Sequence, residues 1–150
     1  MSISPFACHF GITYKCNLLC DHCYADKYKN TADFTYEELC NIVDQLYDIG
    51  IIQIIYSHGE NIMHKDFWRI TKYMRDRGFY VTLMTNGTFI RNLDISQKLY
   101  NTGVRQVFVS FDSMDPEKHD QRRRVPGSFR RAENALKYFS QVEGIRYGMA

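Results

Sequence analysis

The feature that most constrains the fold is a regular alternation of short apolar runs with longer amphipathic segments. Five runs rich in β-branched and aromatic residues predict strands, at residues 8–14, 51–57, 79–85, 104–110 and 144–150. Four amphipathic segments between them predict helices, at residues 35–50, 64–78, 93–102 and 127–141. Strands that alternate with helices pair in parallel through right-handed crossovers. The sequence therefore predicts an α/β fold built on a parallel sheet.

The first two helical segments carry signals for where they begin and end. Thr35 and Glu38 have the spacing of a capping box, and Gly50 stops the segment. Asp66 or a neighbour caps the second segment, which Gly78 ends. The apolar stripe of the first helix consists of Leu39, Ile42, Val43, Leu46 and Ile49.

Polar segments directly follow the predicted strands. They are the cysteine-rich loop after residue 14, the sequence SHGEN at 57–61, TNGT at 85–88 and SFDS at 110–113. The carboxyl ends of parallel strands lie at one edge of a sheet, which is where such folds place their functional loops. We expect these four loops to meet at one site.

Composition excludes several classes of protein. The chain has 150 residues and a net charge of +2, from 19 basic and 17 acidic side chains, so the charge balance favours neither nucleic acid nor an anionic membrane as a partner. No stretch approaches the roughly 18 apolar residues of a membrane span, and residues 1–10 lack a leader pattern. We expect one globular, cytoplasmic domain.

Three cysteines lie within eight residues, at Cys16, Cys20 and Cys23. The other two, Cys8 and Cys40, stand apart, and an odd, clustered set fits a reducing compartment better than a disulfide framework. Four interpretations of these three neighbouring cysteines remain. They are a stripe of small core residues on a helix, a structural zinc site, an electron carrier, or an open iron–sulfur site. Zinc sites usually need a second ligand pair and carriers a fourth cysteine. Three thiolates suit a 4Fe-4S cluster that leaves one iron open.

Four motifs in order give the chain a family resemblance. The motif Cys16-x3-Cys20-x2-Cys23, followed by aromatic Tyr24, resembles the signature of radical S-adenosylmethionine (SAM) enzymes. The segments YSHGENIMHKDF, MTNGTFI and VFVSFDSMDPEKHDQRRRVPGSF resemble later motifs of the same family, especially of peptide and cofactor maturases of the SPASM type. The resemblance covers nearly the whole chain. It implies a partial (β/α) TIM-like barrel, here (βα)4 plus the start of a fifth strand.

The resemblance also implies a chemistry. Cys16, Cys20 and Cys23 would ligate a 4Fe-4S cluster whose free iron binds SAM. Reductive cleavage of SAM would give methionine and a 5′-deoxyadenosyl radical that abstracts a hydrogen atom from a peptide or small-molecule substrate. An electron donor such as flavodoxin or ferredoxin would supply the electron.

Residue roles follow from the same resemblance. Tyr24 would lie near the adenine of SAM. Gly59 and Glu60 would approach its methionine amino group, by backbone and carboxylate. Ser110 and Arg123 would bind the methionine carboxylate and ribose region.

Two further residues have roles that stay open. Asn86 is a candidate site residue, although Asn86-Gly87 is also a common turn. Asp112 would orient Arg123, face the substrate, or cap the turn that follows it. Arg122 and Arg124 are interpreted as solvated charges, and His119, Asp120 and Cys40 as structural residues.

The second motif departs from the family pattern. His58 stands where the family usually has a glycine, and Asn61 where it has a proline, so the path of this loop is uncertain from sequence. His58 is either a tolerated substitution or a proton donor near the substrate.

The expected barrel is incomplete within 150 residues, so we expect an amino-terminal portion of such an enzyme. The alternative functions are a non-catalytic zinc or iron–sulfur module and a degenerate family member that binds a cluster without cleaving SAM.

Overall fold

The structure is a computed structural model that describes residues 6–150. The expectation that residues 1–10 form no leader falls partly on residues 1–5, which lie outside the described range. The strands are β1 (Ala7–Phe10), β2 (Gln53–Tyr56), β3 (Tyr80–Thr85), β4 (Val104–Val109) and β5 (Arg146–Met149). The helices are α1 (Tyr36–Asp48), α2 (Phe67–Asp76), α3 (Leu93–Thr102), α4 (Pro116–Arg123) and α5 (Ser128–Phe139). Two short 3₁₀ helices are η1 (Asp26–Tyr28) and η2 (Asn61–Met63).

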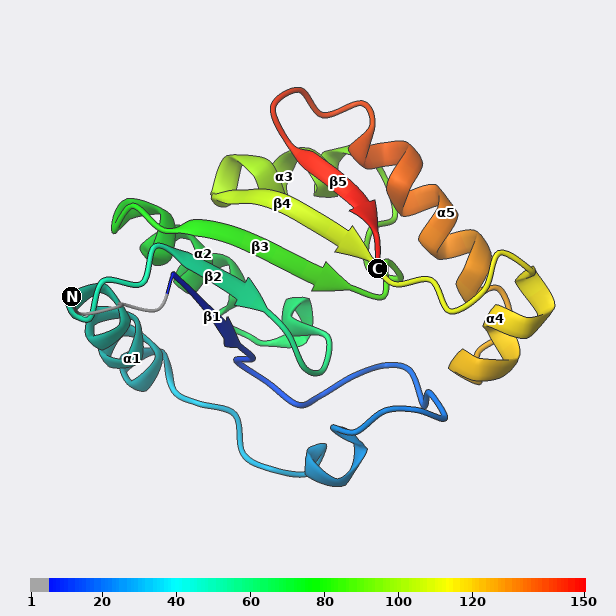
Figure 1. Ribbon diagram of the computed structural model, residues 1–150, viewed down its shortest axis with the longest axis horizontal. Coiled ribbons are helices and arrows are strands. Elements are labelled where there is room, and N and C mark those ends of the chain that lie inside the picture. The colour runs from blue at the N-terminus through cyan, green and yellow to red at the C-terminus, as the bar shows by residue number, and fades with distance from the viewer. Residues whose placement is uncertain (1–5) are drawn as a thin grey trace.

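The sheet is parallel throughout and its strands lie in chain order, β1-β2-β3-β4-β5. Figure 1 shows the crossover helices α1, α2, α3 and α5 on one face of the curved sheet, with the strands pointing toward a common rim. Sequential strand order with every crossover on one side is the arrangement of a (β/α) barrel, whereas a doubly wound sheet reverses its order partway. The predicted α/β partial barrel is confirmed.

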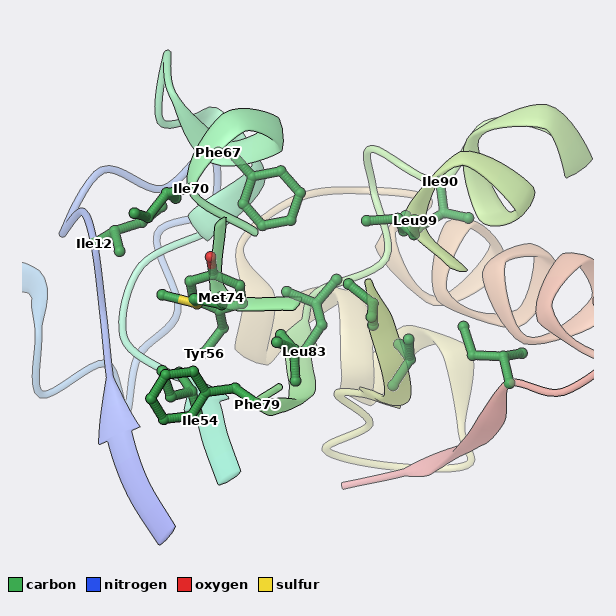
Figure 2. Close-up of a cluster of buried hydrophobic side chains, with 14 of the residues drawn as sticks. Ile12, Ile54, Tyr56, Phe67, Ile70, Met74, Phe79, Leu83, Ile90 and Leu99 are labelled. Carbon is green, nitrogen blue, oxygen red and sulfur yellow. The ribbon is translucent and has the colours of Figure 1, made fainter. Parts of the chain in front are cut away.

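The core fills the space between the sheet and these helices. Tyr56 and Leu83 from the sheet pack with Phe67, Ile70 and Met74 of α2, and all five are fully buried (Figure 2). In β2 burial alternates strictly along the strand, because successive side chains point to opposite faces. One face of this strand is therefore core, and the other lines the inside of the partial barrel.

The predicted signals of α1 are mostly confirmed. Thr35 and Glu38 form both halves of the capping box. Leu39 and Val43 are fully buried, as the stripe predicts. Ile49 does not belong to the buried stripe: the helix ends at Asp48, so Ile49 is turned outward and its side chain is 56% exposed.

Helix α4 was not predicted, because its sequence has no apolar stripe to indicate it. Asp115 caps it by accepting from the backbone N–H groups of Glu117 and Lys118, and Pro116 occupies its first turn. Asp115, and not Asp112, is therefore the residue that caps this segment.

Strand β1 ends at Phe10, four residues before the predicted end. The reason is a side chain from another loop: Asn61 Oδ1 accepts from the backbone N–H of Ile12 at 2.9 Å. This hydrogen bond takes the chain out of the sheet and into the cysteine loop.

Within residues 6–150, no helix has the length and apolar character needed to cross a bilayer.

A core substitution tests this architecture. Leu83→Ala should lower the free energy of unfolding by about 2–5 kcal/mol, because it leaves a cavity at the centre of β3. Met114→Ala is the control, since that side chain is 69% exposed and its loss should change stability by less than about 0.5 kcal/mol. Urea unfolding measures both, and equal effects would contradict the core described here.

Candidate functional site

A cavity of about 380 Å³ opens at the carboxyl rim of the sheet, where the loops after β1, β2, β3 and β4 meet. It brings together nine of the ten candidate site residues. They are Cys16, Cys20, Cys23, Tyr24, Gly59, Asn86, Ser110, Asp112 and Arg123. The tenth, Glu60, is fully buried and lies outside the cavity lining.

A larger hollow of about 680 Å³ lies between α2 and α3 on the outer surface. It is lined mainly by charged and amide side chains, with Lys98 over the ring of Trp68 at 4.1 Å. None of the candidate residues reaches it. Nine of the ten candidate site residues lie instead at the smaller cavity on the rim.

The cysteine loop is held by side chains, since apart from η1 it lacks regular structure. Leu18 and Ala25 of this loop are buried. Lys29 Nζ donates to the carbonyl of Leu18 at 3.0 Å. At the tip, the backbone N–H of Asp21 donates to the carbonyl of Arg122 at 3.0 Å, which ties the loop to the end of α4.

The loop after β2 needs glycine at position 59. Gly59 has φ +51°, and a Cβ there would lie 2.6 Å from the carbonyl oxygen of Thr13 and 2.7 Å from that of Lys15. Only a residue without a side chain fits so close to the backbone. Gly59 therefore packs the second loop directly against the start of the cysteine loop.

Asn61 explains how the chain tolerates the loss of the family's proline. Its side chain is fully buried, accepts from Ile12 and donates to the carbonyl of His58 at 3.0 Å. These hydrogen bonds fix the loop where proline would fix it by its ring.

His58 occupies the left-handed region, at φ +66°, which side chains rarely adopt. Its Nδ1 lies 2.9 Å from the Ser57 hydroxyl, and its ring makes T-shaped contacts with the rings of Tyr14 and Tyr24. Gly11 leaves room for it, because a Cβ at position 11 would lie 3.0 Å from that of His58. The imidazole lines the cavity beside Tyr24, which is 69% exposed.

Glu60 links the second loop to the turn after β3. Its carboxylate accepts from the Thr85 hydroxyl at 2.8 Å and from the backbone N–H of Asn86 at 2.9 Å. Complete burial raises the pKa of Glu60 to about 7, against these two hydrogen bonds and the charge of Arg123, which lower it. The carboxyl is therefore buried without a full counter-charge.

Asp112 and Arg123 form a bidentate ion pair at the cavity wall. Arg123 Nε and Nη2 donate to the two carboxylate oxygens at 2.6 and 2.9 Å, and both side chains are about one-tenth exposed. His22 Nε2 lies 3.5 Å from the same carboxylate. Of the alternatives for Asp112, the structure places it against Arg123.

His119 lies next to this pair, in contact with the backbone of Asp112. It is buried against the rings of Phe111 and Phe129, which also contact each other, and its Nδ1 accepts from the backbone N–H of Asp112 at 3.3 Å. A backbone N–H always donates, so Nδ1 carries no proton. Burial lowers the pKa of His119, which agrees with a neutral ring.

Burial disfavours the thiolate form of Cys16 and Cys20, and neighbouring groups oppose this only in part. Burial raises the pKa of the Cys16 thiol, while the backbone N–H of Leu18, 3.5 Å from the sulfur, lowers it. Burial likewise raises the pKa of the Cys20 thiol, and the guanidinium of Arg123 opposes this. All five cysteines are free thiols.

The donor set fits an iron–sulfur cluster. Three thiols lie on one loop beside a cavity, with a cation and N–H donors next to their sulfurs. Within the described part of the chain, no three His, Cys, Asp or Glu side chains gather as a single metal ion would need. A four-iron cluster binds each thiolate through a separate iron, so its ligands need not converge on one point.

Fold and site together define a partial-barrel α/β protein with a thiol-rich site at the carboxyl rim of its sheet. The chain belongs to the Radical SAM superfamily, which residues 10–147 match. It is 34% identical over 145 residues to the AdoMet-dependent heme synthase of Methanosarcina barkeri, covering 95% of this chain and 41% of that protein. It is 30% identical over 139 residues to the subtilosin biosynthesis protein AlbA of Bacillus subtilis, covering 91% and 31%. The chain thus spans less than half the length of these relatives.

Solved structures share the fold. Streptococcus suis SuiB bound to its precursor peptide SuiA superposes with a TM-score of 0.83 at 18% identity, over 97% of this chain and 32% of that one. Native anSMEcpe with bound AdoMet superposes with a TM-score of 0.77 at 20% identity, over 97% and 43%. The partial barrel expected from the motifs is therefore also the fold of these enzymes.

The raised pKa of Glu60 predicts a pH dependence of stability. The folded chain binds this proton more tightly than the unfolded chain, so the contribution is fully present below pH about 4.5 and is lost as the pH rises through about 7. Between these limits the free energy of unfolding should fall by about 3 kcal/mol relative to Glu60→Gln. Urea unfolding of both proteins across this range measures it, and parallel pH profiles would show that Glu60 does not titrate in this way.

Proposed function

We propose that this chain provides the site of a radical SAM enzyme, in which Cys16, Cys20 and Cys23 hold a 4Fe-4S cluster and the adjoining cavity binds SAM. The observation that carries this proposal is the meeting of three thiols with Gly59, Ser110 and Arg123 in one cavity. Membership of the superfamily supports it.

When bound, the cluster would supply the electron that splits a carbon–sulfur bond of SAM, giving methionine and a 5′-deoxyadenosyl radical that takes a hydrogen atom from the substrate. The residues of this chain bind and orient the reactants. Arg123 uses two N–H groups on Asp112 and also hydrogen-bonds to Cys20, which leaves its remaining N–H groups for the methionine carboxylate. Ser110 lines the same wall.

The methionine ammonium is assigned to the Gly59–Glu60 segment. Gly59 lines the cavity and Glu60 follows it as a buried carboxyl without a full counter-charge. A ligand ammonium against this segment would offset the cost of burying the carboxylate and lower the pKa of Glu60. Tyr24, exposed at the rim beside His58, is assigned to the adenine.

The proposed reaction class is peptide or cofactor maturation in the cytoplasm, with flavodoxin or ferredoxin as electron donor. The relatives named for subtilosin biosynthesis and heme synthesis support it, as does the structure of SuiB with its precursor peptide. The alternatives are a zinc or iron–sulfur module without catalysis and a homologue that keeps the cluster but has lost cleavage.

The cysteine assignment has a direct test. Cys16, Cys20 and Cys23 replaced together by Ala should abolish iron and sulfide binding in anaerobically reconstituted protein, whereas Cys8→Ala and Cys40→Ala should retain about four irons. Iron and sulfide analysis measures this, with 5′-deoxyadenosine formation as a second readout. One bound zinc, or a full cluster in the triple variant, would contradict the proposal. A cluster without 5′-deoxyadenosine would indicate the degenerate homologue.

Arg123 has a matched neighbour for comparison. Arg123→Ala should weaken SAM binding by about 10- to 150-fold while the iron content stays unchanged, because a charge-assisted hydrogen bond is worth roughly 1.5–3 kcal/mol. Arg124→Ala should change binding little, since Arg124 pairs with Asp21 at an exposed position. Isothermal titration with SAM compares them, and equal losses would show that Arg123 has no special role.

A further inference from the structure

A closed ring of hydrogen bonds joins the cysteine loop to the turn after β3. Asn17 Nδ2 donates to Thr88 Oγ1 at 2.8 Å, the Thr88 hydroxyl donates to Asn86 Oδ1 at 2.6 Å, and Asn86 Nδ2 donates to Asn17 Oδ1 at 3.0 Å. The same Asn86 nitrogen lies 3.7 Å from the sulfur of Cys16.

The direction of each proton in the ring is fixed by one backbone group. The backbone N–H of Thr88 points at the Asn86 side chain at 2.9 Å, and it can only donate, so the atom it meets is the amide oxygen. The amide nitrogen of Asn86 therefore faces Asn17 and Cys16. Thr88 gives its hydroxyl proton to Asn86 and so accepts from Asn17, which turns the Asn17 oxygen toward Asn86.

The position of Asn86 is equally well determined. Its side chain is buried, with 8% exposed, and its backbone N–H is held by Glu60 at 2.9 Å. The following Gly87 N–H donates to the Thr85 hydroxyl at 3.1 Å. One N–H of Asn86 serves Asn17, and the other is directed at the Cys16 sulfur in a preorganised arrangement.

We propose that Asn86 raises the reduction potential of the cluster by donating a hydrogen bond to the Cys16 thiolate, with Asn17 and Thr88 as positioning residues. This inference rests on the proposed cluster. Reduction adds negative charge to the cluster and its thiolates, and an N–H dipole directed at a thiolate stabilises that charge. Loss of the donor therefore makes the cluster harder to reduce.

A purely structural role for the ring makes a different prediction. If Asn86 only ties two loops together, its removal lowers stability and leaves the cluster's potential unchanged. Asn92 provides the matched control: its side chain caps α3 by accepting from Ile95 at 3.0 Å, so Asn92→Ala also removes an asparagine hydrogen bond, but in a different loop.

The test is a redox titration of the anaerobically reconstituted chain, followed by electron paramagnetic resonance (EPR) of the reduced cluster. At a fixed potential, Asn86→Ala should lower the ratio of reduced to oxidised cluster about tenfold, a shift of ~59 mV to more negative potential for one electron. Thr88→Val and Asn17→Ala should shift it in the same direction by less. Asn92→Ala should match the wild type.

Distinct results overturn the two proposals. An Asn86→Ala protein with full iron content and an unchanged potential overturns this inference, as does an equal shift in Asn92→Ala. If Asn86→Ala fails to take up iron, the reduction potentials of the Thr88→Val and Asn17→Ala proteins test the inference instead. Unchanged potentials in both of these proteins overturn the inference about Asn86. A wild-type chain that binds no cluster refutes the proposed function itself.

Discussion

The hydrogen bonds accepted by the buried carboxyl of Glu60 are the interactions on which the rest of the site depends. The carboxyl receives the Thr85 hydroxyl and the backbone N–H of Asn86, and so joins the loop after β2 to the turn after β3. Asn86, held in this way, reaches the sulfur of Cys16. Three loops from three strands are thus connected through one acidic side chain, whose burial without a full counter-charge is energetically costly. Such a cost is typical of a group that a ligand completes.

The departures of this chain from its family's motif are compensated locally. Asn61 replaces the ring constraint of proline with side-chain hydrogen bonds to Ile12 and His58. His58 takes a left-handed conformation that glycine would take without cost, and Gly11 supplies the space its side chain needs. The loop therefore keeps Gly59 against the cysteine loop while a new imidazole enters the cavity.

Much of the fold could be predicted from sequence, because it depends on local patterns. The alternation of apolar runs gave the parallel order, and the capping box of α1 lies within four residues. Helix α4 was missed because it is a short polar helix that Asp115 and Pro116 define at its start. The end of β1 was misplaced because Asn61, remote in sequence, takes the N–H of Ile12. Long-range hydrogen bonds of this kind leave no periodic signal.

The site, like the fold, could be predicted from sequence only in part. Strand ends indicated which loops would meet, and nine of the ten candidates line one cavity. The burial of Glu60 and the ring that links Asn17 to Thr88 could not be predicted, since their partners come from different loops. The sequence feature that corresponds to the ring is the set of hydroxyl and amide side chains around Asn86-Gly87, and it can be recognised only once the structure is known.

We propose that Cys16, Cys20 and Cys23 leave one iron of a cluster open to SAM. The decisive measurement is EPR of the reduced, reconstituted chain, recorded with and without SAM. We expect a 4Fe-4S signal whose shape and g-values change when SAM binds, because a new ligand reaches the open iron. A cluster signal that is identical in the presence and absence of saturating SAM would contradict it.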